Sequence, residues 1–218
     1  MPDSRKGKRV LIYSHDSFGL GHLRRCREIA HTLAEAHSSL SVLILSGSPI
    51  IGSFDFRARV DFVRVPGIIK LRNGEYTSLA LHIDVEQTLA MRASIIEHTA
   101  EIFDPDLFIV DKEPLGLRGK AEVTLELLRE RGTPSVLGRR DIMDEPALLA
   151  PAWERKRVVP ALQAYFDDIW VYGLPQICDP LEGIDLPDSV RKKLTYTGYL
   201  KRGLPKAQSQ VPFEKISE

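Results

Sequence analysis

The sequence contains little cysteine, no net charge and no long apolar run. Only two cysteines, Cys26 and Cys178, occur among 218 residues, and no Cys-x-x-Cys pair is present. A disulfide framework and a cysteine zinc site are therefore excluded, and a reducing compartment is indicated. Lysine plus arginine number 30, as do aspartate plus glutamate, so the formal net charge is zero. This balance argues against binding to nucleic acid or to an anionic membrane through bulk charge.

The apolar runs, of which residues 42–45 are typical, fall far short of the roughly 20 residues that a membrane helix needs. The basic N-terminus leads into a short apolar run, residues 10–13. It lacks the longer apolar core and the cleavage site of a secretory signal. We therefore expect a cytoplasmic protein. Peripheral membrane contact through a short stretch such as residues 68–71 stays open.

Hydrophobic residues make up 43% of the chain and charged residues 28%, a globular composition. The length suits one substantial domain, which buries roughly 70% of its unfolded surface. Strand-like runs that are apolar throughout alternate with helical patterns, which predicts an α/β fold, a doubly wound, Rossmann-like parallel sheet covered on both faces. The expected strands are 9–15, 41–46, 61–65, 106–111, 134–138 and 168–172, and the expected helices span about 23–33, 84–103, 119–131 and 152–166.

Two stretches lack this pattern. Residues 68–81 show no clear period, so we expect a long loop there. Past residue 173 prolines recur, and residues 189–218 carry seven basic side chains and two acidic ones. We therefore expect a domain over residues 1–188 and a linker over residues 189–218 that leads toward a missing domain.

In a doubly wound sheet, ligands bind beyond the carboxyl ends of the strands, where strand 1 lies beside strand 4. The loops that leave strands 1, 4 and 5 are residues 14–25, 111–116 and 138–141. They carry two histidines, several carboxylates and four arginines. We therefore place the candidate site at this edge of the sheet.

The first loop begins a dinucleotide fingerprint with Gly19 and Gly21, but Arg24 stands where the third glycine belongs. Strand 2 ends in Ser46-Gly-Ser48, without the acidic partner for a ribose. A nucleotide-binding dehydrogenase is therefore the weakest hypothesis. The two glycines still allow a ligand to approach the backbone and the first amides of the helix.

The motifs of this edge resemble those of the N-terminal half of the GT-B glycosyltransferases. The first loop reads Ser14-His-Asp-x-x-Gly-Leu-Gly-His-x-Arg-Arg25, which is most similar to the MurG-like branch and to a group of predicted glycosyltransferases. Residues 105–111, followed by Lys112 and Pro114, also resemble that group, as does Tyr196-Thr-Gly-Tyr-Leu200. The resemblance covers nearly the whole chain.

The resemblance implies that His22 is the catalytic base and that Asp111 supports it. Apart from the family, neighbouring strands 1 and 4 bring these two side chains toward each other. A carboxylate on one imidazole nitrogen fixes the tautomer and leaves the other nitrogen to take a proton from an acceptor hydroxyl. The competing interpretations are a histidine that bonds to backbone at the helix start and an aspartate that ends a strand.

The other candidates have two interpretations each. His15 competes with His22 for the role of base, or is a buried histidine bonded to backbone. Arg24 and Arg25 either hold a phosphate-bearing acceptor or form the solvated face of the first helix. Arg139 and Arg140, with Asp141, either shape the acceptor cleft or form a surface ion-pair cluster. The substrate-binding residues we predict are His15, Gly19, Gly21, Arg24, Arg139 and Arg140.

Asp104-Pro-Asp106 has the form of the Asp-x-Asp metal motif of other glycosyltransferases, but it precedes strand 4. We interpret it as a turn and a helix stop. No other cluster has metal-ligand spacing, so no metal is expected.

The resemblance implies the acceptor domain of a glycosyltransferase, moving a hexosyl or N-acetylhexosaminyl group from a nucleotide sugar, such as a UDP-sugar, to a small-molecule or lipid-linked acceptor. No cofactor is implied. The donor-binding domain would come in cis or in trans, so we expect negligible transfer by the isolated chain. The alternatives are a GT-B-fold nucleotide-sugar epimerase and a non-catalytic binding or scaffold subunit.

Overall fold

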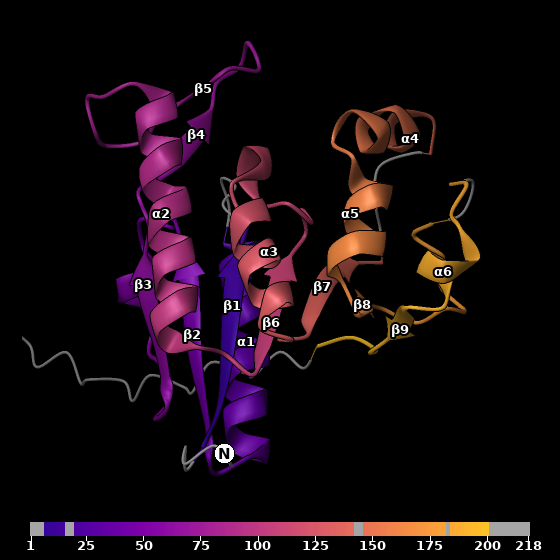
Figure 1. Ribbon diagram of the computed structural model, residues 1–218, viewed down its shortest axis with the longest axis horizontal. Coiled ribbons are helices and arrows are strands. Elements are labelled where there is room, and N and C mark those ends of the chain that lie inside the picture. The colour runs from indigo at the N-terminus through magenta and orange to yellow at the C-terminus, as the bar shows by residue number, and fades with distance from the viewer. Residues whose placement is uncertain (1–6, 16–19, 142–145, 182–183, 201–218) are drawn as a thin grey trace, which may run out of the picture.

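The computed structural model describes residues 7–15, 20–141, 146–181 and 184–200, without the side chains of 146–148. The described residues form a seven-stranded sheet of order β3-β2-β1-β6-β7-β8-β9 in which all pairings are parallel (Figure 1). The predicted doubly wound parallel sheet is confirmed. Its strands are β1 (Lys8–Ser14), β2 (Leu40–Ser46), β3 (Val60–Arg64), β6 (Leu107–Asp111), β7 (Ser135–Arg140), β8 (Asp168–Tyr172) and β9 (Leu194–Tyr196).

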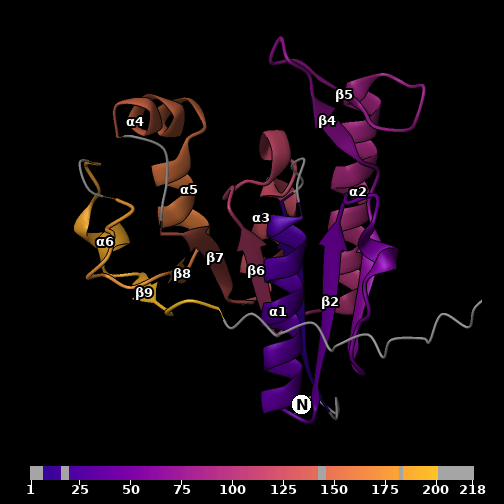
Figure 2. The same ribbon diagram turned by 180° about the vertical axis from the view of Figure 1, so that it is seen from behind.

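The core lies in two apolar layers, one on each face of the sheet. Successive side chains of a strand point to opposite faces, so the apolar run of β1 supplies both layers. Leu11 and Tyr13 pack in one layer, and Val10 and Ile12 pack in the other. The first layer is covered by α2 (Val85–Phe103), α3 (Glu122–Glu130), α4 (Pro146–Arg155), α5 (Val158–Tyr165) and α6 (Asp188–Arg191), and the second by α1 (Gly21–Ala36) (Figure 2).

The single helix predicted over residues 152–166 is wrong, because α4 and α5 are separate. Arg157, between them, adopts a left-handed conformation with φ 53°. Pro160 has no N–H with which to continue a helix from residue 156, and its ring would clash with the carbonyl there. In the structure Pro160 lies in the first turn of α5, where that N–H is not needed.

Residues 68–81, expected as a loop, contain an antiparallel hairpin. Strands β4 (Ile68–Lys70) and β5 (Tyr76–Ser78) pair Ile69 with Thr77. Gly74 supplies the positive φ of the turn, 89°. Strands of three residues are too short to show an alternating pattern in the sequence. The hairpin lies beside the N-terminal part of α2, at the top of Figure 1.

Residues 189–200, expected to begin a linker, instead extend the sheet. β9 pairs with β8, and Val190 of α6 is fully buried. The Lys193 ammonium donates to the carbonyls of Leu162, Gln163 and Phe166. These contacts fix the segment to α5, so the body of the domain continues past residue 188. Residues 201–218 lie outside the described residues.

Short 3-10 turns, η1 (Ile51–Ser53) and η2 (Leu117–Gly119), follow β2 and β6. Within the described part of the chain, we find no helix with the length and apolarity that membrane crossing requires.

Candidate active site at the carboxyl edge of the sheet

Three neighbouring strands end at the candidate site. β1 lies beside β6, as predicted from the switch-point rule, and β6 also lies beside β7. Asp111 is the last residue of β6. Arg139 and Arg140, expected in a loop, still belong to β7, because the strand pairs with β8 as far as Arg140 and Tyr172. Being consecutive on a strand, the two arginines leave β7 on opposite faces of the sheet.

His22, Asp111 and Arg25 form a connected group. The Nδ1 atom of His22 lies 2.5 Å from Oδ2 of Asp111, and Nη1 of Arg25 donates to Oδ1 at 2.8 Å. His22 and Arg25 are one turn apart on α1 and therefore share a helix face. The Asp111 side chain is 1% exposed, so both of its oxygens depend on these two partners. The contact predicted between His22 and Asp111 is present.

The orientation of this pair suits proton transfer. An ionised carboxylate accepts hydrogen bonds only, so Asp111 selects the His22 tautomer that carries its proton on Nδ1. The Nε2 atom is then left with a lone pair. His22 lines a cavity at this edge, which places that ring where a ligand can reach it.

His15, the competing candidate for the base, has a different environment. It is 8% exposed, and its ring meets the His22 ring edge-on, with 5.6 Å between centroids. Burial, assisted by the charge of Lys112, lowers the pKa of His15 to about 3. Its Nδ1 has no hydrogen-bond partner among the described residues. A histidine with so low a pKa is a weak proton acceptor, so His22 is the better candidate.

Two other predicted residues stand apart from this group. Arg24 is exposed on α1 and does not line the cavity. Gly21 is the first residue of α1, and a Cβ there would meet no atom within 4 Å. Gly19 lies outside the described residues.

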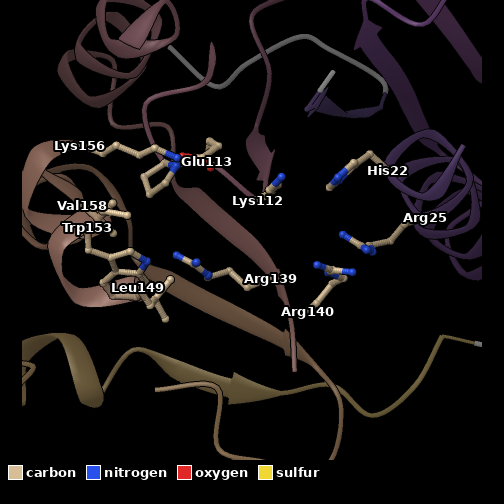
Figure 3. A pocket seen from close by; sticks show the side chains of 12 residues that line it. His22, Arg25, Lys112, Glu113, Arg139, Arg140, Leu149, Trp153, Lys156 and Val158 are labelled. Atoms are coloured by element: carbon tan, nitrogen blue, oxygen red, sulfur yellow. Dashed lines mark hydrogen bonds and ion pairs between the residues drawn. The ribbon is translucent and has the colours of Figure 1, made fainter. Parts of the chain in front are cut away.

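The cavity itself opens between the end of β6, the end of β7 and the helices α4 and α5 (Figure 3). Its volume is about 100 Å³. Arg139 and Arg140, predicted from the sequence, lie in its wall. The complete lining is His22, Arg25, Lys112, Glu113, Pro114, Arg139, Arg140, Leu149, Ala152, Trp153, Lys156 and Val158.

The cationic side chains of the cavity differ in their surroundings. Arg139 is buried, with its guanidinium carbon 4.4 Å from the Trp153 ring centroid, and burial lowers its pKa to about 10. Burial also lowers the pKa of Lys112. Lys156 forms a 2.8 Å ion pair with Glu113. Arg139 is buried and is therefore not part of a surface cluster, whereas Arg140 is exposed.

Sequence reasoning missed the contribution of α4 and the support beneath the site. Trp153 comes from α4 and Lys156 from the turn that follows it, about 40 residues after β6, and no motif connects them to the site. Tyr172 packs beneath Arg25, 5.3 Å from ring centroid to guanidinium carbon. A Cβ at Gly138 would overlap the Tyr172 hydroxyl, so this glycine admits the ring. In the sequence, the only feature that could have indicated this support is the glycine that directly follows the apolar run of β7.

The Asp104-Pro-Asp106 turn lies at the opposite end of β6. Asp104 ends α2 in a left-handed conformation, and Asp106 accepts from the Arg9 backbone N–H and the Lys8 ammonium. The interpretation as a turn and helix stop is confirmed. In the described ranges, no three His, Cys, Asp or Glu side chains are grouped so as to hold a metal ion.

No protein-family model matches the chain, and no curated protein matches it. The chain does match solved structures. UGT71G1 of Medicago truncatula, solved with UDP-glucose, aligns with TM-score 0.53 and 14% identity over 95% of this chain and 55% of its own. Apo UGT2 of Phytolacca americana aligns with TM-score 0.55 and 14% identity over 90% and 53%, respectively. The glycotransferase of kitacinnamycin aligns with TM-score 0.50 and 16% identity over 94% and 54%.

These likenesses, at low identity, concern the fold. The sheet and its flanking helices match the N-terminal half of GT-B glycosyltransferase structures. The chain spans about half the length of the proteins it matches.

Proposed function

We propose that this chain is the acceptor-binding half of a GT-B glycosyltransferase of the MurG-like branch, with His22 as the general base. The observation that carries the proposal is the 2.5 Å contact between His22 and the buried Asp111 at the switch point of the sheet. The fold supports the same assignment, since it is shared with glycosyltransferase structures.

The proposed reaction transfers a hexosyl or N-acetylhexosaminyl group. The Nε2 atom of His22 takes the proton of an acceptor hydroxyl as its oxygen forms a bond to the anomeric carbon of the donor. The bond from that carbon to the diphosphate of a nucleotide sugar breaks, and the diphosphate leaves with the electron pair. Asp111 stabilises the imidazolium that forms, and Arg25 holds Asp111 in place.

The donor-binding part of the proposed enzyme would come from a second domain, in cis or in trans. Residues beyond 200 would connect to it. Because the donor contacts would lie in that domain, we propose that this chain alone transfers sugar negligibly, and that the complete enzyme works in the cytoplasm.

The test is an assay of this chain together with its donor-binding domain, with labelled nucleotide sugars and a panel of hydroxyl acceptors. His22→Ala should lower kcat by about 10²–10⁴, the usual contribution of a positioned base. Asp111→Asn should lower it as well, through the loss of tautomer selection. His98→Gln is the matched control, because His98 is a largely exposed histidine on α2. A His22→Ala enzyme with unchanged kcat would refute the role of base.

The same assay separates the alternatives. A nucleotide-sugar epimerase would convert its donor without any acceptor, so product formed in the absence of acceptor would favour that reaction. A binding subunit would keep its partner affinity and show no turnover that depends on His22.

A further inference from the structure

The hydrogen bond to Asp111 fixes only part of the His22 side chain. The contact between Nδ1 and Oδ2, 2.5 Å long, holds one atom of the imidazole. The second torsion angle of a histidine side chain has broad minima, so the plane of the ring can still tilt about this contact. A base has to present its lone pair in a defined direction, and a misplacement of about 1 Å can cost about 10²-fold in rate. A second contact is therefore needed to fix the ring.

The ring of His15 makes such a contact. Its centroid lies 5.6 Å from that of the His22 ring, and the two planes form an angle of 77°. Aromatic rings prefer this separation and this angle when the edge of one meets the face of the other. The His22 side chain is 14% exposed and His15 is buried, so the rings meet largely out of water. The contact therefore limits the tilt of the His22 ring.

The sheet itself places His15. The residue follows Ser14, the last residue of β1, which is buried and pairs with Ser46 of β2. On its other side β1 pairs with β6, the strand that ends in Asp111. A site is held most precisely by groups on helices and strands. Asp111 and His15, which both contact the His22 ring, thus come from two neighbouring strands, whereas His22 itself comes from α1.

The surroundings of His15 keep it neutral. The titratable groups that act on it are Lys112 after β6, Lys156 after α4, His22 on α1 and Asp111 on β6. Burial, followed by the charge of Lys112, lowers the pKa of His15 to about 3, and the opposing attraction of Asp111 is smaller. His15 therefore stays uncharged at neutral pH and adds no repulsion when His22 takes up a proton.

We propose that His15 is a positioning residue for His22, whose neutral ring packs edge-on against the imidazole and keeps the Nε2 lone pair directed into the cavity. The reference to a base rests on the proposed function, whereas the coupling of the two rings does not. In this role His15 takes no proton and touches no reacting atom. It supplies the shape of a ring, so an aromatic ring without nitrogen should replace it.

Nitrogen NMR of the histidine side chains in the 218-residue chain tests the coupling without any turnover. At pH 9, where an imidazole of ordinary pKa is neutral, the wild-type chain should show one His22 tautomer, protonated on Nδ1. His15→Ala should give a mixture of both tautomers, and His15→Phe should keep the single one. His15→Gln, which fills more of the site than alanine does, should also give the mixture. The His22→Gln variant assigns the His22 signals.

His31→Ala is the matched control. His31 is a buried histidine on the same helix, and its ring meets that of Phe56 edge-on, with 6.2 Å between centroids. The control variant therefore loses a buried ring as His15→Ala does, but it should leave the His22 signals unchanged.

The kinetic prediction concerns the complete enzyme. His15→Ala should lower kcat about tenfold with little change in KM, and His15→Phe should recover most of the loss. A change in KM alone would make His15 a ligand contact and overturn the proposal. An unchanged His22 tautomer or an unchanged kcat in His15→Ala would overturn it too, as would a His15→Phe variant that behaves like His15→Ala.

The NMR measurement and the His22→Ala assay fail independently of each other. A His22 tautomer that depends on His15, in an enzyme whose kcat does not depend on His22, would support the contact between the rings and refute the base. A tautomer that is independent of His15, with kcat lost in His22→Ala, would refute the positioning role and support the base.

Discussion

At the scale of single residues, the side chain of Asp111 is held by two neighbours that come from one helix. Arg25 and His22 occupy its two oxygens, and the carboxylate is almost fully buried. Breaking a buried ion pair from one side leaves the other charge without compensation, which is commonly strongly destabilising. Arg25 is therefore a positioning residue in our proposal, although the sequence alone left it open whether it faces solvent.

We predict that Arg25→Gln lowers stability by about 2–4 kcal/mol, since Asp111 would lose one of its two partners. In the complete enzyme kcat should fall at least tenfold while KM changes little, because the variant disturbs the base rather than acceptor binding. Urea unfolding and steady-state kinetics measure the two effects. Arg25→Lys should recover part of both, because it restores the charge without the fork of donors. A KM effect alone would contradict the positioning role.

The lowered pKa of His15 leads us to predict that the stability of the fold depends on pH. Its pKa is about 3 in the folded protein and near 6.5 when unfolded, so the unfolded state binds the proton first as pH falls. The contribution of His15 to stability is therefore complete above pH 6.5 and is lost progressively below it, at about 1 kcal/mol per pH unit. His31, with its pKa lowered to about 4 by burial, acts in the same direction.

Urea unfolding at pH 7 and pH 4.5 tests this prediction. The free energy of unfolding should fall more steeply for the wild-type chain than for His15→Gln, and His31 is present in both. The difference between the two slopes isolates His15, whatever the variant does to stability at pH 7. Parallel curves would show that His15 takes up its proton equally in both states.

At the scale of elements, the sequence predicted the features that depend on short-range patterns of apolar and polar residues. The apolar strand patterns predicted the parallel sheet, and the switch-point rule predicted that His22 lies near Asp111. Three elements could not be predicted for physical reasons: the β4–β5 hairpin is too short to show a period, the break at Arg157 depends on a left-handed backbone, and β9 is held by long-range contacts of Lys193.

The same reasoning explains which parts of the site the sequence revealed. Side chains that follow a strand directly, such as Asp111 and Arg140, are located by topology alone. Trp153 reaches the cavity from α4 and Lys156 from the turn after it, and the position of both depends on packing between helices and sheet. Such placement follows from shape complementarity in the core, which no local motif encodes.

At the scale of the whole molecule, the folded body includes α6 and β9. The strand β9 covers the edge of β8, Val190 is fully buried, and three carbonyls accept from Lys193. Full burial of a valine side chain such as that of Val190 stabilises the fold by about 1.5–3 kcal/mol. Each hydrogen bond to a charged group adds about 1.5–3 kcal/mol, so removal of α6 and β9 should destabilise the whole domain.

We therefore predict that a chain ending at residue 187 is less stable than a chain ending at residue 200 by at least about 2 kcal/mol, because it forfeits the buried Val190 and exposes the β8 edge. Urea midpoints of the two chains, at one protein concentration, measure this difference. Lys193→Met in the longer chain is the matched control for the ammonium contacts and should account for part of the loss. Equal midpoints for the chains ending at 187 and 200 would place α6 and β9 outside the folded body.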